Sequence, residues 1–264
     1  MQVKHISLHS KDEIEQFLRL NAHLHVYSIG DLDDFFWPHT VWYALEHEGG
    51  IKQIILVYTA FDTPTVLAFT ESPVDEMRDF LRSTMRLLPK RFYTHLTEGL
   101  RGVLEADYHV TCHGTFYKMA LTDATRLDTI DTSAAVRLYK IDLPDIEELY
   151  RVSYPGNWFD ARMLETDHYY GMRRDGQLVS VAGVHVYSER YRVAALGNVT
   201  THPQLRGQGI ASAACARLCQ ELLRTVDHIG LNVQADNRSA ISAYERLGFV
   251  RIATYEECSV ELAC

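Results

Sequence analysis

The segment from Val193 to Leu222 constrains the fold of this chain most strongly, because it places a glycine-rich turn between a strand and a helix. Its residues read VAALGNVTT, then HPQLRGQG, then IASAACARLCQEL. The apolar part predicts a buried strand, and Ala211, Cys215, Leu218 and Leu222 repeat at the spacing of one helix face. Gly207 and Gly209 leave the backbone at the helix start open to close approach.

A helix N-terminus has unpaired N–H groups and the positive end of the helix dipole, so it binds anions. Arg206 adds a cation whose planar guanidinium matches phosphate oxygens. The turn lacks the GK[ST] of a phosphate-binding loop for nucleotide hydrolysis and the three spaced glycines of a dinucleotide-binding turn. The sequence therefore predicts an anion site that serves neither nucleotide hydrolysis nor hydride transfer.

A second motif follows in the stretch LNVQADNRSAISAYERLGF, residues 231–249. Asn237 stands at a helix N-cap position, and Ala240, Ile241, Tyr244 and Leu247 share one face of the helix that follows. Gly248 is placed to end it. Tyr244 on its own is explained equally well as a tyrosine at the edge of the core.

The chain reads as two halves, each predicted to be an α/β fold with a mixed, mostly antiparallel sheet flanked by helices. Both halves open with a short strand and an acidic-capped amphipathic helix, which suggests duplication. The stretch ATRLDTIDTSA at 124–134 has no apolar periodicity and is predicted to be a linker. In the second half, Asp175-Gly176 predicts a hairpin turn, and the strands at 193–201 and 228–235 flank a helical crossover.

The second half resembles the GCN5-related N-acetyltransferases, the GNAT superfamily. Arg206, Gly209 and Ala211 match the family's [QR]-x-x-G-x-[GA] pyrophosphate loop, and the stretch from Asn237 to Phe249 matches its next motif. The resemblance covers about residues 136–257. It implies two GNAT-like domains, a degenerate one without CoA at 1–125 and a catalytic one at 134–264. A tandem arrangement is similar to the FR47-like and glycine N-acyltransferase-like groups.

In that family, acyl-CoA lies where two parallel strands splay apart, and this resemblance assigns roles along the matching residues. The backbone at Val199 and Thr201 would bond the pantetheine arm, with Asn237 on its other side. Tyr244 takes the place of the general acid that protonates the departing thiolate. The residues implied to bind acetyl-CoA or another acyl-CoA are Val199, Thr201, Arg206, Gly207, Gln208, Gly209, Ile210, Ala211, Asn237 and Tyr244.

A general base is harder to assign, because Gly197 and Asn198 occupy the region where the family often has a glutamate. His185, in VSVAGVHVYS, is the candidate base, with a histidine merely hydrogen-bonded in the sheet as the alternative. His202 fits a structural turn beside Pro203. Asp160 and Glu165 lie in the region that lines the family's acceptor pocket, and the alternative is that they are charges on a helix surface. The aromatic residues Tyr154, Trp158 and Phe159 lie in the region that shapes the acceptor site, and the alternative is a hydrophobic plug between the halves.

Composition narrows the partners. A formal net charge of -9 disfavours nucleic acid, and no apolar run has the length of a membrane span, so a cytoplasmic protein is expected. Five cysteines without a CxxC pair suggest neither a disulfide framework nor a zinc site, and Cys215 and Cys219 are interpreted as small core residues. Thirteen histidines form no ligand motif, so no metal is expected.

The sequence thus predicts an acyl-CoA-dependent N-acyltransferase that transfers acetyl to the primary amine of a small molecule in a ternary complex. Oligomerisation is compatible with the sequence but not indicated by it. Two alternatives stay open. One is a non-catalytic acyl-CoA sensor, and the other is an acetyltransferase that acts on a protein amine.

Overall fold

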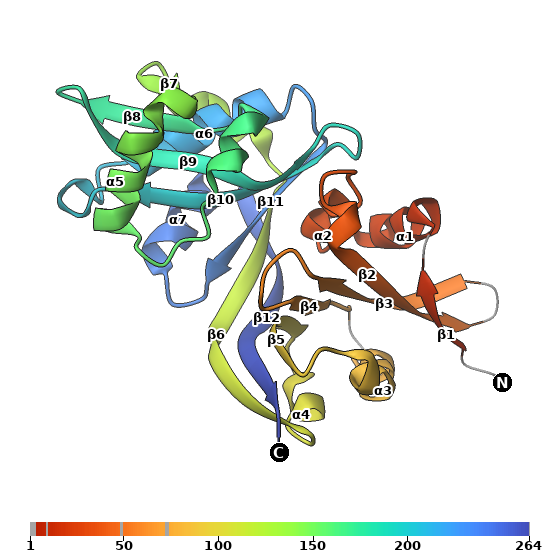
Figure 1. Cartoon of the computed structure of the whole chain (residues 1–264). Coiled ribbons are helices and arrows are strands. Elements are labelled where there is room, and N and C mark those ends of the chain that lie inside the picture. The colour runs from red at the N-terminus through yellow and green to blue at the C-terminus, as the bar shows by residue number, and fades with distance from the viewer. Residues whose placement is uncertain (1–3, 9, 48–49, 72–73, 264) are drawn as a thin grey trace. The chain divides into compact units, whose positions relative to one another are not determined.

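A computed structural model describes residues 4–8, 10–47, 50–71 and 74–263 (Figure 1). The chain divides into two compact units that are discontinuous in sequence. Unit 1 comprises Met1–Lys118, Gln234–Asp236 and Ile252–Cys264, and unit 2 comprises Met119–Val233 and Asn237–Arg251. The two long strands β6 (Tyr108–Leu121) and β12 (Phe249–Leu262) supply residues to both units. The units therefore differ in extent from the continuous ranges 1–125 and 134–264.

The sheet of unit 1 is mixed, with one parallel pair. Its strand order is β1-β2-β3-β4-β5-β12-β6. Strands β4 and β5 run parallel, and the pairs β1–β2, β2–β3, β3–β4 and β5–β12 run antiparallel. The remaining strands of this sheet are β1 (Lys4–Leu8), β2 (Thr40–His47), β3 (Gly50–Tyr58), β4 (Thr65–Ala68) and β5 (Arg91–Thr97).

Helices pack on both faces of this sheet because β3 is apolar on both. Ile55 and Val57 belong to the core cluster that includes Met77 and Phe80 of helix α3, whereas Leu56 faces a small cavity lined by Leu18 and His25. Pro89 follows the end of α3 and its 3₁₀ extension Met85–Leu87, where a proline cannot continue the helix. The helices are α1 (Lys11–Leu18), α2 (Val26–Gly30), α3 (Asp75–Thr84) and α4 (Arg101–Leu104).

Unit 2 has the strand order β11-β10-β9-β8-β7. The pairs β7–β8, β8–β9 and β9–β10 are antiparallel, and β10–β11 is parallel. The predicted hairpin turn is confirmed, with Asp175 at φ 48° and Gly176 at φ 80° between β8 and β9. The strands are β7 (Ala135–Arg137), β8 (Tyr170–Arg174), β9 (Gln177–Ser188), β10 (Val193–Thr201) and β11 (His228–Gln234).

Helices α5 (Leu143–Ser153) and α6 (Ile210–Leu222) lie on opposite faces of this sheet, and α7 (Arg238–Arg246) precedes β12 (Figure 1). Of the predicted apolar face of α6, Cys215, Leu218 and Leu222 are at most 1% exposed, whereas Ala211 in the first turn is half-buried. Residues Ala161–Thr166 form a 3₁₀ segment. Each unit is thus a mixed sheet with flanking helices, and the predicted α/β class is confirmed.

The prediction of a linker at 124–134 is wrong. Residues Ala124–Thr129 form a 3₁₀ segment, and Leu127 is 1% exposed. Gln220 of α6 donates its amide to the Leu127 carbonyl at 3.2 Å and accepts from Thr132 at 3.3 Å. Arg126 Nη1 also donates to the Glu245 carbonyl at 3.1 Å. One buried leucine and these three polar contacts fix the segment on unit 2, and contacts of this kind give no apolar periodicity in the sequence.

The cysteines also differ from expectation. Cys112 of β6 and Cys258 of β12 form a disulfide, with their Cα atoms 4.0 Å apart. The odd number of cysteines concealed this pair, because the two residues are 146 positions apart and meet only through strand pairing. Cys215 and Cys219 are free and buried, as predicted, and burial raises the pKa of both thiols.

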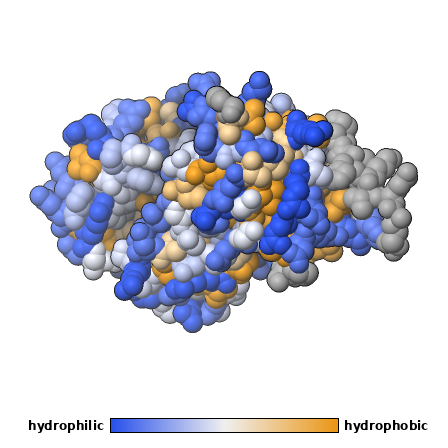
Figure 2. All heavy atoms as spheres, turned by 90° about the horizontal axis from the view of Figure 1, so that it is seen from below, coloured by the Kyte–Doolittle hydropathy of each residue, from blue (hydrophilic) through white to orange (hydrophobic). Residues whose placement is uncertain are grey.

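Exposed apolar side chains on the face in Figure 2 are interspersed with hydrophilic residues. None of the helices in the described part of the chain has the length and hydrophobicity needed to span a membrane. Among the described residues, no three His, Cys, Asp or Glu side chains are grouped so that they could hold a metal ion.

Candidate acyl-CoA site

The parallel strands β10 and β11 separate part of the way along their length. They pair from Val193 with His228 to Leu196 with Leu231, and β10 then continues to Thr201 while β11 continues to Gln234. The predicted splayed strand pair is therefore confirmed. In open α/β sheets, ligands bind beyond the carboxyl ends of parallel strands, which is where this pair diverges.

A bulge in β10 accounts for the divergence. The register with β9 shifts between Gly197 and Thr200, and Asn198 has a left-handed backbone at φ 54°. Bulges bend the strand that contains them and break its pairing. Asparagine tolerates the left-handed region better than most residues, so Asn198 suits this position.

Two tyrosines hold the bulge. Tyr150 of α5 donates its hydroxyl to the Asn198 carbonyl at 2.8 Å, and Asn198 Nδ2 donates to the Tyr169 hydroxyl at 3.2 Å. Burial raises the pKa of both tyrosines, so their hydroxyls stay protonated. The sequence did not identify these two tyrosines as positioning residues, because in the sequence they cannot be distinguished from other buried aromatic residues. The one local indication of the bulge was Asn198, a polar residue within an apolar strand.

The glycine-rich turn lies immediately after β10. A 3₁₀ turn, Pro203–Leu205, follows the strand, and Gly207 and Gly209 then adopt φ 78° and 76°. Gly209 is the N-cap of α6, and the first N–H to bond back is that of Ala213, to the Gly209 carbonyl at 3.1 Å. The N–H groups before Ala213 thus have no acceptor within the helix.

The space beside these glycines is open. A Cβ added at Gly207 or Gly209 would meet no protein atom within 4 Å, and residues 206–209 are exposed. N–H donors at the positive end of a 13-residue helix, beside this open space, are suited to bind an anion.

The Arg206 guanidinium, which the sequence predicts to contact phosphate, bonds two backbone carbonyls of the protein. Its Nε donates to the Thr201 carbonyl at 3.2 Å and its Nη2 donates to the Ser153 carbonyl at 3.0 Å. The guanidinium therefore ties the turn to the ends of β10 and α5. Its backbone N–H donates at 3.5 Å to the Pro203 carbonyl.

Helix α7 has the predicted N-cap. Asn237 Oδ1 accepts from the Ala240 N–H at 3.2 Å and from Ser239 Oγ at 3.1 Å, so the side chain is committed to the cap. Tyr244 is 9% exposed, and its ring packs edge-on against Phe249 with the centroids 5.8 Å apart. Tyr244 is thus a nearly buried phenol on the helix that follows β11.

His185 is half-buried on β9, and its ring lies against the backbone of Gly197 on β10. A Cβ at Gly197 would lie 1.9 Å from His185 Cδ2, so only glycine leaves room for this ring. Of the two acids named from the sequence, Asp160 caps the 3₁₀ segment and pairs with Arg162 at 2.7 Å, and hydrogen bonds from Arg162 lower its pKa. Glu165 is exposed.

The aromatic loop after α5 is divided between core and surface. Phe159 packs between Tyr150 and Tyr169, with ring centroids 5.1 and 5.7 Å away. Tyr154 and Trp158 are 41% and 61% exposed. Phe159 is therefore half-buried against two tyrosines of unit 2, whereas Tyr154 and Trp158 are exposed.

Unit 1 contains buried ionisable groups that the sequence did not reveal. Lys118 is 3% exposed, and its Nζ lies over the rings of Phe69, Tyr27 and Tyr255 at 4.0, 5.1 and 5.7 Å. Burial lowers the pKa of Lys118 to about 7 and raises the pKa of nearby Asp31 to about 7. A lysine at position 118 of an apolar strand gives no local sign of this environment.

Comparison with known proteins agrees with this geometry. Residues 135–249 match the model of the acetyltransferase (GNAT) family. A Drosophila protein has a similar structure, with a TM-score of 0.69 at 13% identity, covering 99% of this chain and 98% of that chain. A tandem GNAT protein from the clavulanic acid biosynthesis pathway gives 0.57 at 15% identity, covering 100% and 99%. A GNAT-family acetyltransferase from Colwellia psychrerythraea gives 0.59 at 12% identity, covering 98% and 100%.

A splayed parallel strand pair followed by an open glycine turn is the geometry that the resemblance to the acetyltransferases implies for an acyl-CoA site. The second half of the chain matches the acetyltransferase (GNAT) family model, and the fold of the whole chain is similar to that of a tandem GNAT protein.

Proposed function

We propose that unit 2 transfers an acetyl group from acetyl-CoA to the primary amine of a small molecule, directly and within a ternary complex. The observation that carries this proposal is the turn at Gly207 and Gly209, with its unpaired N–H groups and open approach at the end of a diverging strand pair.

In this proposal, the backbone N–H groups from Gly207 to Ala211 hold the diphosphate, whereas that of Arg206 bonds the Pro203 carbonyl. The backbone of β10 at Val199 and Thr201, where β11 no longer pairs, bonds the pantetheine arm, and Asn237 contacts the arm from the start of α7. When bound, acetyl-CoA supplies the activated acyl group and a thiolate leaving group.

Tyr244 is the proposed general acid. Its nearly buried phenol holds a proton in surroundings of low dielectric, where protonating a developing thiolate contributes most. His185 is the proposed base, since it is half-buried beside Gly197 near the start of the β10 bulge. The exposed rings of Tyr154 and Trp158 offer faces that bind an organic ammonium ion by cation–π contact.

We assign no acyl-CoA to unit 1, whose β4–α3–β5 crossover parallels β10–α6–β11. Thr70 N–H donates to Thr97 Oγ1 at 3.0 Å, and that hydroxyl donates to the Thr70 carbonyl at 3.3 Å, bridging the parallel pair just beyond β4. Helix α3 opens with Asp75 and Glu76, whose charges repel phosphate. Both observations favour a degenerate half without CoA.

The test is a thermal-shift titration with acetyl-CoA, followed by thiol release from a panel of amines. Ligand at about 100 times its dissociation constant stabilises the protein by about 2.7 kcal/mol, a rise of several degrees. Binding with turnover of small amines supports the proposal, and turnover only of peptide amines moves the acceptor to proteins. Binding without any turnover favours the sensor, and no shift refutes an acyl-CoA site.

A further inference from the structure

The disulfide in unit 1 joins two cysteines in very different surroundings. Cys112 of β6 is exposed, whereas Cys258 of β12 is completely buried in the core cluster that contains Phe92 and Val260. A small thiol or disulfide from solvent can therefore approach the Cys112 sulfur and not the Cys258 sulfur. Neither cysteine takes part in the acyl-CoA site proposed for unit 2.

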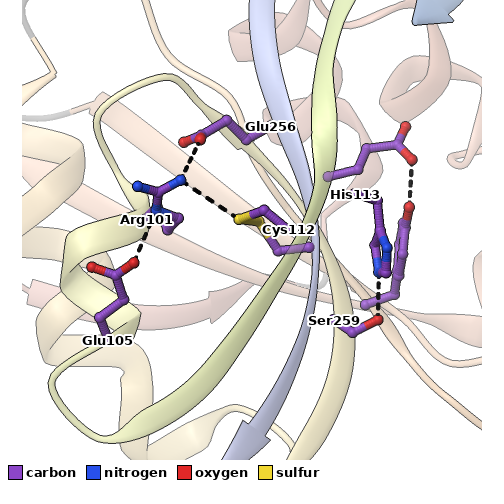
Figure 3. The surroundings of a disulfide bond; sticks show 9 residues. Arg101, Glu105, Cys112, His113, Glu256 and Ser259 are labelled. Carbon is purple, nitrogen blue, oxygen red and sulfur yellow. Dashed lines mark hydrogen bonds and ion pairs between the residues drawn. A yellow bond between two sulfur atoms is a disulfide. The ribbon is translucent and has the colours of Figure 1, made fainter.

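A cation lies beside the exposed sulfur. Arg101 Nη1 is 3.7 Å from Cys112 Sγ, and the guanidinium is fixed by Glu256 at 2.9 Å and by Glu105 at 2.9 Å (Figure 3). A guanidinium at this distance stabilises a thiolate on Cys112. The two carboxylates that position Arg101 also offset part of its charge, so the stabilisation is modest.

The surroundings of the Cys258 sulfur disfavour its thiolate form. Cys258 is 0% exposed among apolar side chains, where a thiolate is disfavoured. The same cause acts on the buried Cys215 of this chain, because burial raises the pKa of its thiol. Cys258 therefore reacts slowly as a nucleophile and leaves reluctantly as a thiolate.

We propose that Cys112 is a modification site for low-molecular-weight disulfides, and that Cys258 resolves the mixed disulfide into the cross-strand bond. The Cys112 thiolate attacks one sulfur of RSSR, whose S–S bond breaks and releases RS⁻. Cys258 then loses its proton and attacks the Cys112 sulfur, which expels the second RS⁻. Two protein thiols are oxidised, RSSR is reduced to two RSH, and the thiol protons end on the RSH.

The difference in exposure between Cys112 and Cys258 sets the order of the two reaction steps. The first step is fast because Cys112 is accessible and Arg101 stabilises its thiolate, and the second is slow because Cys258 is buried. The mixed disulfide at Cys112 accumulates before the bond closes. Once closed, the bond resists reduction, since attack at the accessible Cys112 sulfur has to expel the buried Cys258 thiolate.

Closing this bond has a topological effect on unit 2. Both segments of unit 2, Met119–Val233 and Asn237–Arg251, lie between Cys112 and Cys258 in the sequence. Oxidation of a site in unit 1 thereby encloses the whole of unit 2 in one covalent loop.

The experiment follows the reduced full chain after addition of glutathione disulfide, in a Cys264→Ser background that removes the fifth cysteine. Samples are quenched at intervals, and intact mass and peptide mapping locate each adduct. The expected result is one glutathione on Cys112, then its loss as the Cys112–Cys258 peptide pair appears. In Cys258→Ala the adduct persists.

Arg101→Gln tests the role of the cation. Without the cation, the fraction of Cys112 present as thiolate falls about tenfold, but the thiolate of higher pKa is the better nucleophile. The glutathione adduct therefore forms about threefold more slowly in Arg101→Gln than in the parent chain. The matched control is Arg82→Gln, which removes the same charge from an ion pair with Asp79 on α3. A first adduct on Cys258, Cys215 or Cys219, or an unchanged rate in Arg101→Gln, overturns the proposal. So does an adduct that never gives way to the disulfide in the parent chain.

Discussion

Alanine at Gly209 should weaken CoA binding more than it weakens the fold. At φ 76°, an L-residue costs about 1–2 kcal/mol of conformational strain. A Cβ at this position meets no protein atom within 4 Å, so its steric conflict is with whatever approaches the N–H groups of α6. Losing one charge-assisted hydrogen bond to phosphate costs about 1.5–3 kcal/mol, which raises the dissociation constant about 10- to 150-fold.

Gly176 provides the matched control. It has φ 80°, it also has no atom within 4 Å of an added Cβ, and it lies in the β8–β9 hairpin of the same unit. Gly176→Ala therefore carries a similar strain without blocking the turn. Calorimetric titration with CoA measures affinity, and thermal unfolding without ligand measures stability, where each 1 kcal/mol corresponds to about 2–4 °C.

The two variants should lose similar stability, and only Gly209→Ala should lose affinity. Native affinity in Gly209→Ala would refute the assignment of the turn as the diphosphate site. An equal loss of affinity in Gly176→Ala would show that strain in unit 2, and not approach to the helix start, controls binding.

Three further predictions concern single side chains. Tyr244→Phe should lower turnover about 10²- to 10⁴-fold with CoA affinity unchanged, measured by thiol release and calorimetry, and wild-type turnover would exclude it as the acid. Gly197→Ala should destabilise unit 2 by about 1–3 kcal/mol through overlap with His185, and adding His185→Ala should restore most of this in urea unfolding; strict additivity would contradict the contact. Lys118 has a folded pKa of about 7, below its unfolded value of 10.5, so between these values the unfolded state binds more protons and stability rises with pH. Lys118→Met should remove this rise. The free energy of unfolding of the variant, relative to that of the native chain, should therefore fall between pH 7 and pH 9, and a difference that stays constant with pH would show that Lys118 titrates normally.

Features defined by local chemistry were predictable from the sequence. The bounds of β10, the Asp175-Gly176 turn and the start of α6 at Gly209 all depend on residues that neighbour one another in the chain. Caps, turns and apolar spacing report short-range preferences, and here tertiary packing agrees with them.

Features that depend on distant pairing were not predictable. The Cys112–Cys258 bond requires the alignment of two strands 146 residues apart. Tyr150 and Tyr169 act on Asn198 only after α5 and β10 are assembled. For the candidate site, the sequence indicated the glycine turn and Tyr244. It did not indicate that the Arg206 side chain bonds two backbone carbonyls, because the rotamer of a side chain depends on neighbours from other parts of the chain.

The sharing of β12 between the units has a consequence for the order of synthesis. Residues 252–264 belong to unit 1, yet a ribosome makes them after all of unit 2. Unit 1 therefore cannot complete its sheet beside β5 while it is the only part of the chain that has emerged. Domains usually fold in the order in which they emerge. In this chain, the first half to be translated is the last to acquire all its strands.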